Sequence, residues 1–203
     1  MNNTDSVSAF LASRRSTPRP ALRDPAPEGE RLDALLTAAV RVPDHGRLQP
    51  WRLILIDRAA QKRLRPALRE AARRLGRDEE SIEKDARSWD SPLIVAVVFA
   101  PVESPKIPKW EQHLSAGAVC LSLVNAALAD GWGATWLTGP AAMDRGFMEN
   151  ALGLAKQEEI AGFIHLGSCE HAWHRHGSQY LPKSCKAPSG NSNRRICAEM
   201  PFP

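Results

Sequence analysis

One segment, from Trp110 to Asp130, constrains the fold more than any other part of this chain. Its apolar residues recur at helical spacing but lie all around the predicted helix, not along one stripe. A helix that is apolar on all sides is buried on all sides. We therefore predict a central helix, and we expect a second copy of the chain to cover what one chain of 203 residues cannot. The alternative is a monomer whose own core buries the helix.

The remaining patterns mix helices with strands. Amphipathic helices are predicted at residues 6–13, 30–40, 58–87 and 143–152. Short apolar runs predict strands at residues 51–57, 93–100 and 160–168, and the glycine-rich segment 131–139 predicts another. This mixture along one chain of moderate length indicates a single α/β or α+β domain.

Composition argues against several classes of protein. The chain is 43% hydrophobic and 25% charged, as is usual for a soluble domain. Its net charge of +4 gathers in the tail, where residues 169–203 carry five basic and two acidic residues, so we expect no nucleic-acid partner. No apolar run approaches the roughly 20 residues of a membrane span, and the N-terminus does not resemble a signal peptide. Four cysteines do not make a disulfide scaffold in a chain this long. We expect a cytoplasmic protein without a membrane partner.

A polar loop at residues 41–51 lies between a predicted helix and a predicted strand. It holds two arginines, an aspartate, a histidine and a glutamine. Pro43 and Pro50 stiffen its backbone, and Gln49 before Pro50 is expected to be extended. Many hydrogen-bonding groups on a stiff backbone favour a ligand-binding loop over an ordinary polar connection.

A second cluster of donors follows the first predicted helix. Arg14, Arg15 and Ser16 stand at its end, on a chain that Pro18 forces to turn. Guanidinium forks and a hydroxyl suit a phosphate group. The alternative is a solvated basic helix end that complements the helix dipole.

Glycines after the long helix would let the backbone approach a flat ligand closely, because Gly131, Gly133 and Gly139 have no Cβ. Beyond residue 168 apolar periodicity vanishes, and histidines and cysteines appear at positions 169, 171, 174, 176, 185 and 197. Their spacing is not a standard zinc pattern, so we predict no metal site there. We expect residues 169–203 to form a tail that is poorly ordered or wraps a partner.

Several of these pieces together resemble the flavin-dependent nitroreductase family, in its compact bacterial NAD(P)H nitroreductase type. They occur in family order over residues 6–168: Arg14-Arg15-Ser16, Pro43-Asp44-His45, Gln49-Pro50-Trp51, Trp110-Glu111-Gln112, Ser115-Ala116-Gly117, Gly131 to Gly139 with Trp136, and Gly162-Phe163 to Leu166-Gly167.

The resemblance implies an α+β fold, with a central sheet flanked by helices in an intertwined homodimer and one FMN in each of two interface sites. Residues 1–168 would form the FMN-binding domain, and residues 169–203 a divergent tail. By resemblance, Ala126 to Gly131 matches a contact to the nicotinamide nucleotide. The cofactor-binding residues implied are Arg14, Arg15, Ser16, Arg41, His45, Gln49, Trp136, Leu137 and Thr138.

The implied activity is transfer of hydride from NADH or NADPH to a small-molecule electron acceptor, such as a nitro-aromatic, quinone-like or other conjugated compound. FMN carries this chemistry, so we predict neither a catalytic side chain nor a metal. The alternative function is a non-catalytic flavin- or metal-binding protein in which the His/Cys tail is the working part.

Overall fold

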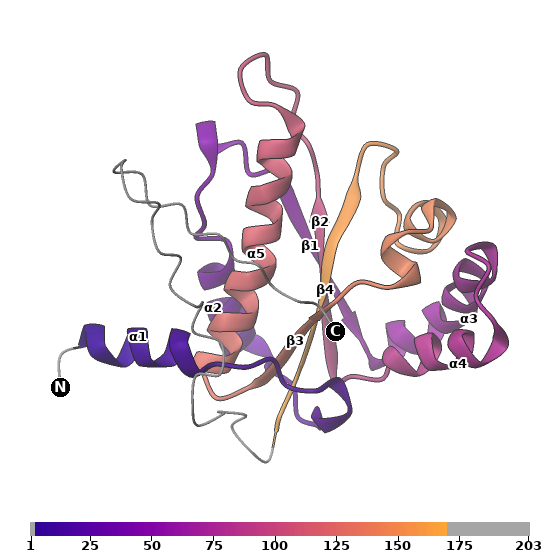
Figure 1. Cartoon of the computed structure of the whole chain (residues 1–203), viewed down its shortest axis with the longest axis horizontal. Helices are drawn as coiled ribbons and strands as arrows, with labels where there is room; N and C mark the ends of the chain where they lie inside the picture. Colours follow the sequence, from indigo (N-terminus) through magenta and orange to yellow (C-terminus); the bar gives the residue numbers. More distant parts are fainter. Residues whose placement is uncertain (1–2, 170–203) are drawn as a thin grey trace, which may run out of the picture. The chain divides into compact units, whose positions relative to one another are not determined.

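A computed structural model describes residues 3–169 of the chain (Figure 1). Within this range, residues 3–15 and 16–169 belong to two compact units, and each is described by itself. The first unit holds α1 (Asn3–Ser13), which confirms the predicted N-terminal helix and starts earlier than expected. The Arg14 backbone N–H extends the helix by donating to the Phe10 carbonyl at 2.7 Å.

The second unit is built on an antiparallel sheet whose described strands lie in the order β1-β2-β4-β3. The strands are β1 (Trp51–Asp57), β2 (Leu93–Phe99), β3 (Gly133–Leu137) and β4 (Glu159–Gly167). The predicted strands are all present. In β1, however, only Ile56 is buried, so its short apolar run does not mark a fully buried strand. Every residue of β2 is buried, as its uninterrupted apolar sequence requires.

One face of the sheet is covered by α2 (Gly29–Ala39) and α5 (Lys109–Ala129), and Figure 1 shows α5 lying across it. Within the described chain α5 is not buried on all sides, so the alternative in which one chain's own core buries the whole helix is wrong. Trp110 and Leu114 are 66% and 64% exposed, and Leu121 is also exposed. Their spacing of four and seven residues places them on one stripe of the helix. The opposite side of α5 packs into the core.

The length and composition of α5 would also allow it to cross a membrane, so the expectation that no segment is apolar enough for a span is wrong for this helix. Seven of its residues are buried in the protein, among them Val119, Leu123 and Ala127. Six of these seven, all except Gln112, pack against the sheet in one hydrophobic cluster. We therefore assign α5 as a core helix.

The other face of the sheet is covered by α3 (Arg58–Arg74) and two short turns, and α4 (Glu79–Ser88) packs against α3. The single helix predicted over residues 58–87 is wrong in one respect, because Gly76, at φ 73°, ends the first part and the Asp78 carboxylate caps the second. The short helix predicted at 143–152 is confirmed in part, as a π-helical turn (Phe147–Ala151) that follows a 3₁₀ turn (Pro140–Ala142). The Asp144 carboxylate accepts from the Phe147 N–H at the start of the π-helical turn.

The arginines of α3 are matched by acidic groups. Arg69 makes two hydrogen bonds to the Glu83 carboxylate, and Arg74 makes two to Asp144. Asp144 is buried, so this second pair fixes the π-helical turn to α3. A surface of paired charges has little net field to attract a polyanion. The described geometry therefore favours a structural role for these arginines.

A polar group lies deep in the sheet, where an apolar run was expected. His165 of β4 is only 1% exposed, and its Nδ1 lies 2.8 Å from the Ser91 Oγ. The Gln61 side chain donates to the Ser91 carbonyl and accepts from its N–H, at 2.8 and 3.1 Å. Burial, together with the nearby charge of Arg19, lowers the pKa of His165 from 6.5 to about 3. The ring is therefore neutral in the folded protein at ordinary pH.

We expect this histidine to make stability fall as the solution becomes acidic. Because the folded pKa is depressed, the contribution is full above pH 6.5 and is lost as the unfolded chain takes up its proton below that value. The free energy of unfolding should fall by up to about 1.4 kcal/mol per pH unit more in the wild type than in His165→Asn. Urea unfolding between pH 7 and pH 5 measures this difference, and carboxylates titrate in both proteins. Parallel curves for the two proteins would contradict it.

Candidate functional site

The polar loop between α2 and β1 has an unusual backbone. Gly46, Arg47 and Gln49 all have positive φ, at 72°, 55° and 48°. The prediction of an extended Gln49 is wrong, because its N–H donates to the Asp44 carboxylate at 2.8 Å and the chain curls around this bond. Two non-glycine residues in the left-handed region are costly and cluster at functional sites. The loop is thus fixed in one backbone conformation that costs conformational free energy.

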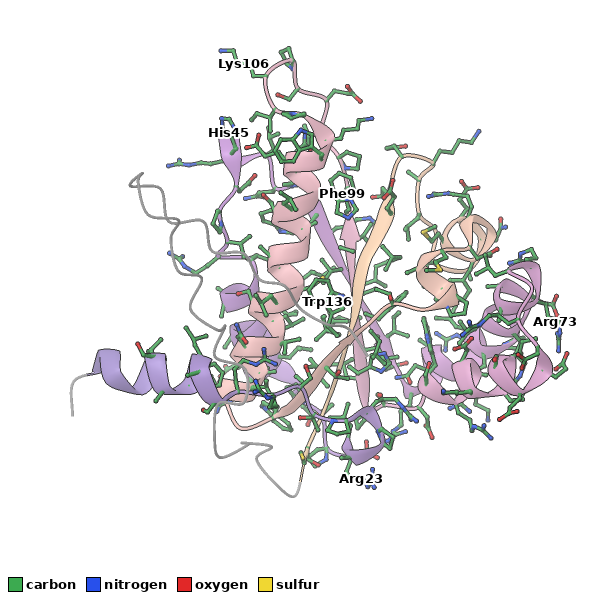
Figure 2. The ribbon with its side chains drawn as sticks, in the orientation of Figure 1. Arg23, His45, Arg73, Phe99, Lys106 and Trp136 are labelled. Atoms are coloured by element: carbon green, nitrogen blue, oxygen red, sulfur yellow. The ribbon has the colours of Figure 1, made fainter. Side chains whose placement is uncertain are left out.

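The predicted ligand-binding side chains of this loop face outward. Arg41, His45 and Gln49 are all exposed. The His45 Nδ1 lies 2.7 Å from the Glu111 Oε1 at the start of α5. Figure 2 shows His45 near the end of α5 from which the loop carrying Lys106 extends. The loop therefore presents donors on a fixed frame next to this end of the helix.

A second group of predicted residues lies at the β3 edge of the sheet. The Thr17 N–H donates to the Ala134 carbonyl at 2.8 Å, and the Ala134 N–H donates to the Thr17 hydroxyl at 3.2 Å. Both main-chain groups of Ala134 thus point away from β4. Because this direction alternates along a strand, the main-chain groups of Trp136 point to the same outer edge. Ser16 precedes Thr17, so the structure brings Ser16 to the edge that carries Trp136.

The Trp136 side chain packs on glycine. A Cβ added to Gly162 of β4 would overlap the indole and would lie 2.6 Å from its Cδ1 atom. Glycine is therefore required at this position by close packing of the ring. The indole is 39% exposed, and Leu137 and Thr138 follow it at the end of the strand. A partly exposed, firmly seated ring at a sheet edge can form one wall of a site for a flat ligand.

The other predicted contacts belong to different segments of the chain. Arg14 and Arg15 belong to the first unit, where the Arg15 guanidinium donates to the Arg14 carbonyl at 3.3 Å. The segment Ala126 to Gly131 ends α5, and there the Asp130 carboxylate accepts from the Trp132 indole N–H at 3.1 Å and pairs with Arg31. Asp130 is thus already engaged.

Within one chain, the two groups of predicted residues do not meet. Figure 2 shows His45 well apart from Trp136. The structure unites Ser16 with the β3 edge, and it places Arg41, His45 and Gln49 on the separate loop. Among described residues there is no cluster of three or more metal-ligating side chains. Of the tail's histidines and cysteines, Cys169 alone falls within the described range, and the other members lie outside it.

A family model described as "Nitroreductase family" matches residues 11–168. The chain belongs to the nitroreductase family. It is 37% identical over 160 residues to "Putative NAD(P)H nitroreductase YdjA" of Escherichia coli (strain K12), covering 78% of this chain and 86% of that protein. This confirms the resemblance drawn from the motifs.

Solved nitroreductase structures share the fold. A nitroreductase-like protein from Bacillus cereus superposes with a TM-score of 0.69 at 24% identity, covering 100% of this chain and 98% of its own. A nitroreductase in complex with FMN from Desulfovibrio desulfuricans gives a TM-score of 0.62 at 22% identity, with 97% and 98% coverage. At these identities the likeness establishes the α+β fold, which the resemblance had implied.

Sequence reasoning assigned no role to Glu111, Gly162 or Thr17, which organise the site. Glu111 meets His45 across 66 positions of sequence, and no local pattern reveals such a pair. Gly162 did carry a signal, since a glycine inside an apolar strand often marks close approach of another group. Thr17 lies in a proline-rich stretch, whose composition is typical of surface connections, yet it is buried.

We expect Gly162→Ala to dislodge the Trp136 indole. The added methyl group meets a bulky ring at a distance that no real Cβ tolerates, so the free energy of unfolding should fall by about 1–3 kcal/mol. Denaturant unfolding measures this loss. The matched control repeats the substitution in a Trp136→Ala background, where the clash is gone and the additional loss should be small. An equal loss in both backgrounds would show that the ring is not what requires glycine.

Proposed function

We propose that the protein is an FMN-dependent oxidoreductase that takes hydride from NADH or NADPH and reduces a small conjugated acceptor, such as a nitro-aromatic or a quinone. Family membership supports the reaction class. The observation that carries the cofactor assignment is the outer edge of β3, where Thr17, the chain neighbour of Ser16, pairs with Ala134 and where the partly exposed Trp136 lies. We further propose that the protein acts in the cytoplasm and binds neither nucleic acid nor membrane.

The described residues fit FMN in their chemistry. A flavin offers a flat apolar ring with a polar edge, and a phosphate at the end of a flexible chain. The indole of Trp136 and the outward groups of the β3 edge suit the ring. Arg14, Arg15 and Ser16 supply donors of the kind that bind phosphate. The names of solved relatives include a nitroreductase in complex with FMN, which supports the same choice.

The remaining predicted contacts support a site shared between two chains. His45 lies apart from Trp136 in one chain, so a single flavin that used both would need the loop of a second chain. The exposed stripe of Trp110, Leu114 and Leu121 on α5 is an apolar surface that a second copy would cover. We therefore propose a homodimer in which Arg41, His45 and Gln49 reach the flavin of the other subunit.

The chemistry of a bound flavin explains why the candidate site contains few reactive side chains. Bound FMN would supply hydride acceptance and hydride donation, so the protein needs no nucleophile of its own. Ser16 and the arginines before it would bind the phosphate end. The β3 edge would orient the ring by its main-chain groups, and Gln49 would meet the polar edge of the ring. Trp136 would exclude water from one side.

The purified protein should be yellow and should lose its visible absorbance when NADH or NADPH is added without oxygen. Air or a nitro-aromatic should then restore the colour. Absorption spectra and stopped-flow reoxidation measure these steps. The control is the same protein kept without oxygen and without NADH or NADPH, which should keep its colour. Protein that stays colourless after incubation with FMN would contradict the proposed function.

Two defective variants should rescue each other if the site is shared. Arg14→Ala removes a charge-assisted contact of about 1.5–3 kcal/mol, or roughly ten- to over a hundredfold in FMN affinity. Arg41→Ala should have a comparable effect on the flavin of the other chain. When the two variants exchange subunits, each mixed dimer has one site with both lesions and one with neither. Random pairing then leaves about a quarter of all sites intact.

Flavin reduction by NAD(P)H, measured before and after exchange, reports the rescue, and mass spectrometry verifies that mixed dimers formed. Mixing either variant with itself is the control. If both arginines serve the flavin of their own chain, every site keeps a lesion. Verified exchange without recovered reduction would therefore overturn the shared site while leaving the cofactor assignment intact.

A further inference from the structure

His45 has one hydrogen-bond partner among residues 3–169. Its Nδ1 lies 2.7 Å from the Glu111 Oε1, and no other described group hydrogen bonds to the ring. The His45 side chain is 62% exposed, whereas that of Glu111 is 32% exposed. Because a carboxylate only accepts, Nδ1 must carry the hydrogen of this contact. Nε2 is therefore the ring atom left to meet another molecule.

Glu111 is itself held firmly. It lies in the first turn of α5, where its N–H donates to the Pro108 carbonyl at 3.1 Å. The next residue, Gln112, is buried. Its amide accepts from the Val102 N–H and donates to the Val102 and Ile107 carbonyls, at 2.9, 2.9 and 3.0 Å. These three bonds fix the start of the helix to the loop before it, so Glu111 is a rigid anchor.

The backbone beside His45 is fixed by packing. Gly46 lies against Ile107, because a Cβ at Gly46 would lie 2.6 Å from the Ile107 Cδ1, and its positive φ of 72° also favours glycine. Ile107 is the residue whose carbonyl Gln112 holds. The main chain of the loop thus rests on the same segment that anchors Glu111. One apolar contact and one hydrogen bond thus hold His45 and the backbone beside it.

An ordinary surface ion pair would not need such support. Exposed pairs contribute little to stability, since solvent screens them and long side chains lose freedom in forming them. Here His45 lies on a loop that contains two residues with positive φ, Arg47 and Gln49. Its short side chain is oriented by the carboxylate of Glu111, which lies on α5. In many functional sites a carboxylate accepts a hydrogen bond from one ring nitrogen of a histidine. This bond fixes the orientation of the ring, so that the other ring nitrogen faces the ligand.

We propose that Glu111 is a positioning residue of the flavin site, which holds His45 by Nδ1 and so presents Nε2 to the cofactor. The proposal rests on the function proposed above. Glu111 touches no substrate or cofactor in this scheme and acts only through His45. Its contribution should therefore vanish when His45 is absent.

A double-mutant cycle in FMN affinity tests this directly. The full-length proteins are wild type, Glu111→Ala, His45→Ala and the double variant, and FMN release on dilution is followed by flavin fluorescence. Glu111→Ala should weaken FMN binding roughly three- to tenfold, whereas the double variant should match His45→Ala alone. Glu111→Gln should fall between, because its amide oxygen still accepts from Nδ1. This conservative variant also covers the case in which Glu111→Ala fails to fold.

The matched control is Glu103→Ala. Glu103 precedes the same helix and pairs with Lys109 at 3.3 Å, but it does not contact His45. Its removal deletes an equal charge from the same region and should leave FMN affinity unchanged. An equal loss in Glu103→Ala and Glu111→Ala would mean that net charge, not positioning, is responsible, and it would overturn the proposal.

A second measurement does not depend on flavin. Nitrogen-15 NMR of the histidines in FMN-free protein should show His45 protonated at Nδ1, with this state lost or averaged in Glu111→Ala. Additive losses in the cycle, or an unchanged His45 spectrum in the variant, would overturn the role of Glu111. If the wild type itself takes no FMN, the proposed function is wrong, and the NMR comparison still decides whether Glu111 fixes the ring.

Discussion

The packing of α5 against the sheet is the contact on which the rest of the structure depends. Val119, Leu123 and Ala127 of α5 are buried against one face of β2 and β4. The side chains of these two strands contribute to the hydrophobic clusters on both faces of the sheet. A helix of 21 residues extends about 30 Å. Its start anchors the loop that carries His45, and its end leads through Gly131 into β3. The helix thus separates the two halves of the candidate site as a rigid spacer.

The strands and the main helices followed from the sequence because their patterns depend on local physics. An apolar run of β-branched residues at 93–100 can hardly be anything but a covered strand. The break in the helix at 58–87 was missed because charged residues kept a helical period across Gly76, and the period outweighed the glycine. The π-helical form of the turn at 147–151 was missed for another reason. It depends on Asp144, which Arg74 binds across 70 positions of sequence.

The candidate site could likewise be predicted only in part. Motifs indicated its residues, but the spacing of those residues did not predict the contacts that some of them make in the structure. Gln49 was expected to be extended because a proline follows it, yet the bond from its N–H to Asp44 selects positive φ. The pairing of His45 with Glu111 could not be inferred, since it exists only after the loop and the helix have packed. Sequence motifs thus indicated which residues belong to the candidate site, and tertiary contacts determine their backbone conformation and side-chain orientation.

The outer edge of β3 has a consequence for solubility. A strand at the border of a sheet offers unpaired N–H and C=O groups on which another molecule can build a strand, and this is a common start of aggregation. Here Thr17 occupies the border at Ala134 with two hydrogen bonds. The bulky indole of Trp136 stands over the sheet immediately beyond it, and Gly139 then turns the chain away. The free edge of β3 at Trp136, which would contact a ligand, is therefore too short and too obstructed to pair with a strand of another chain.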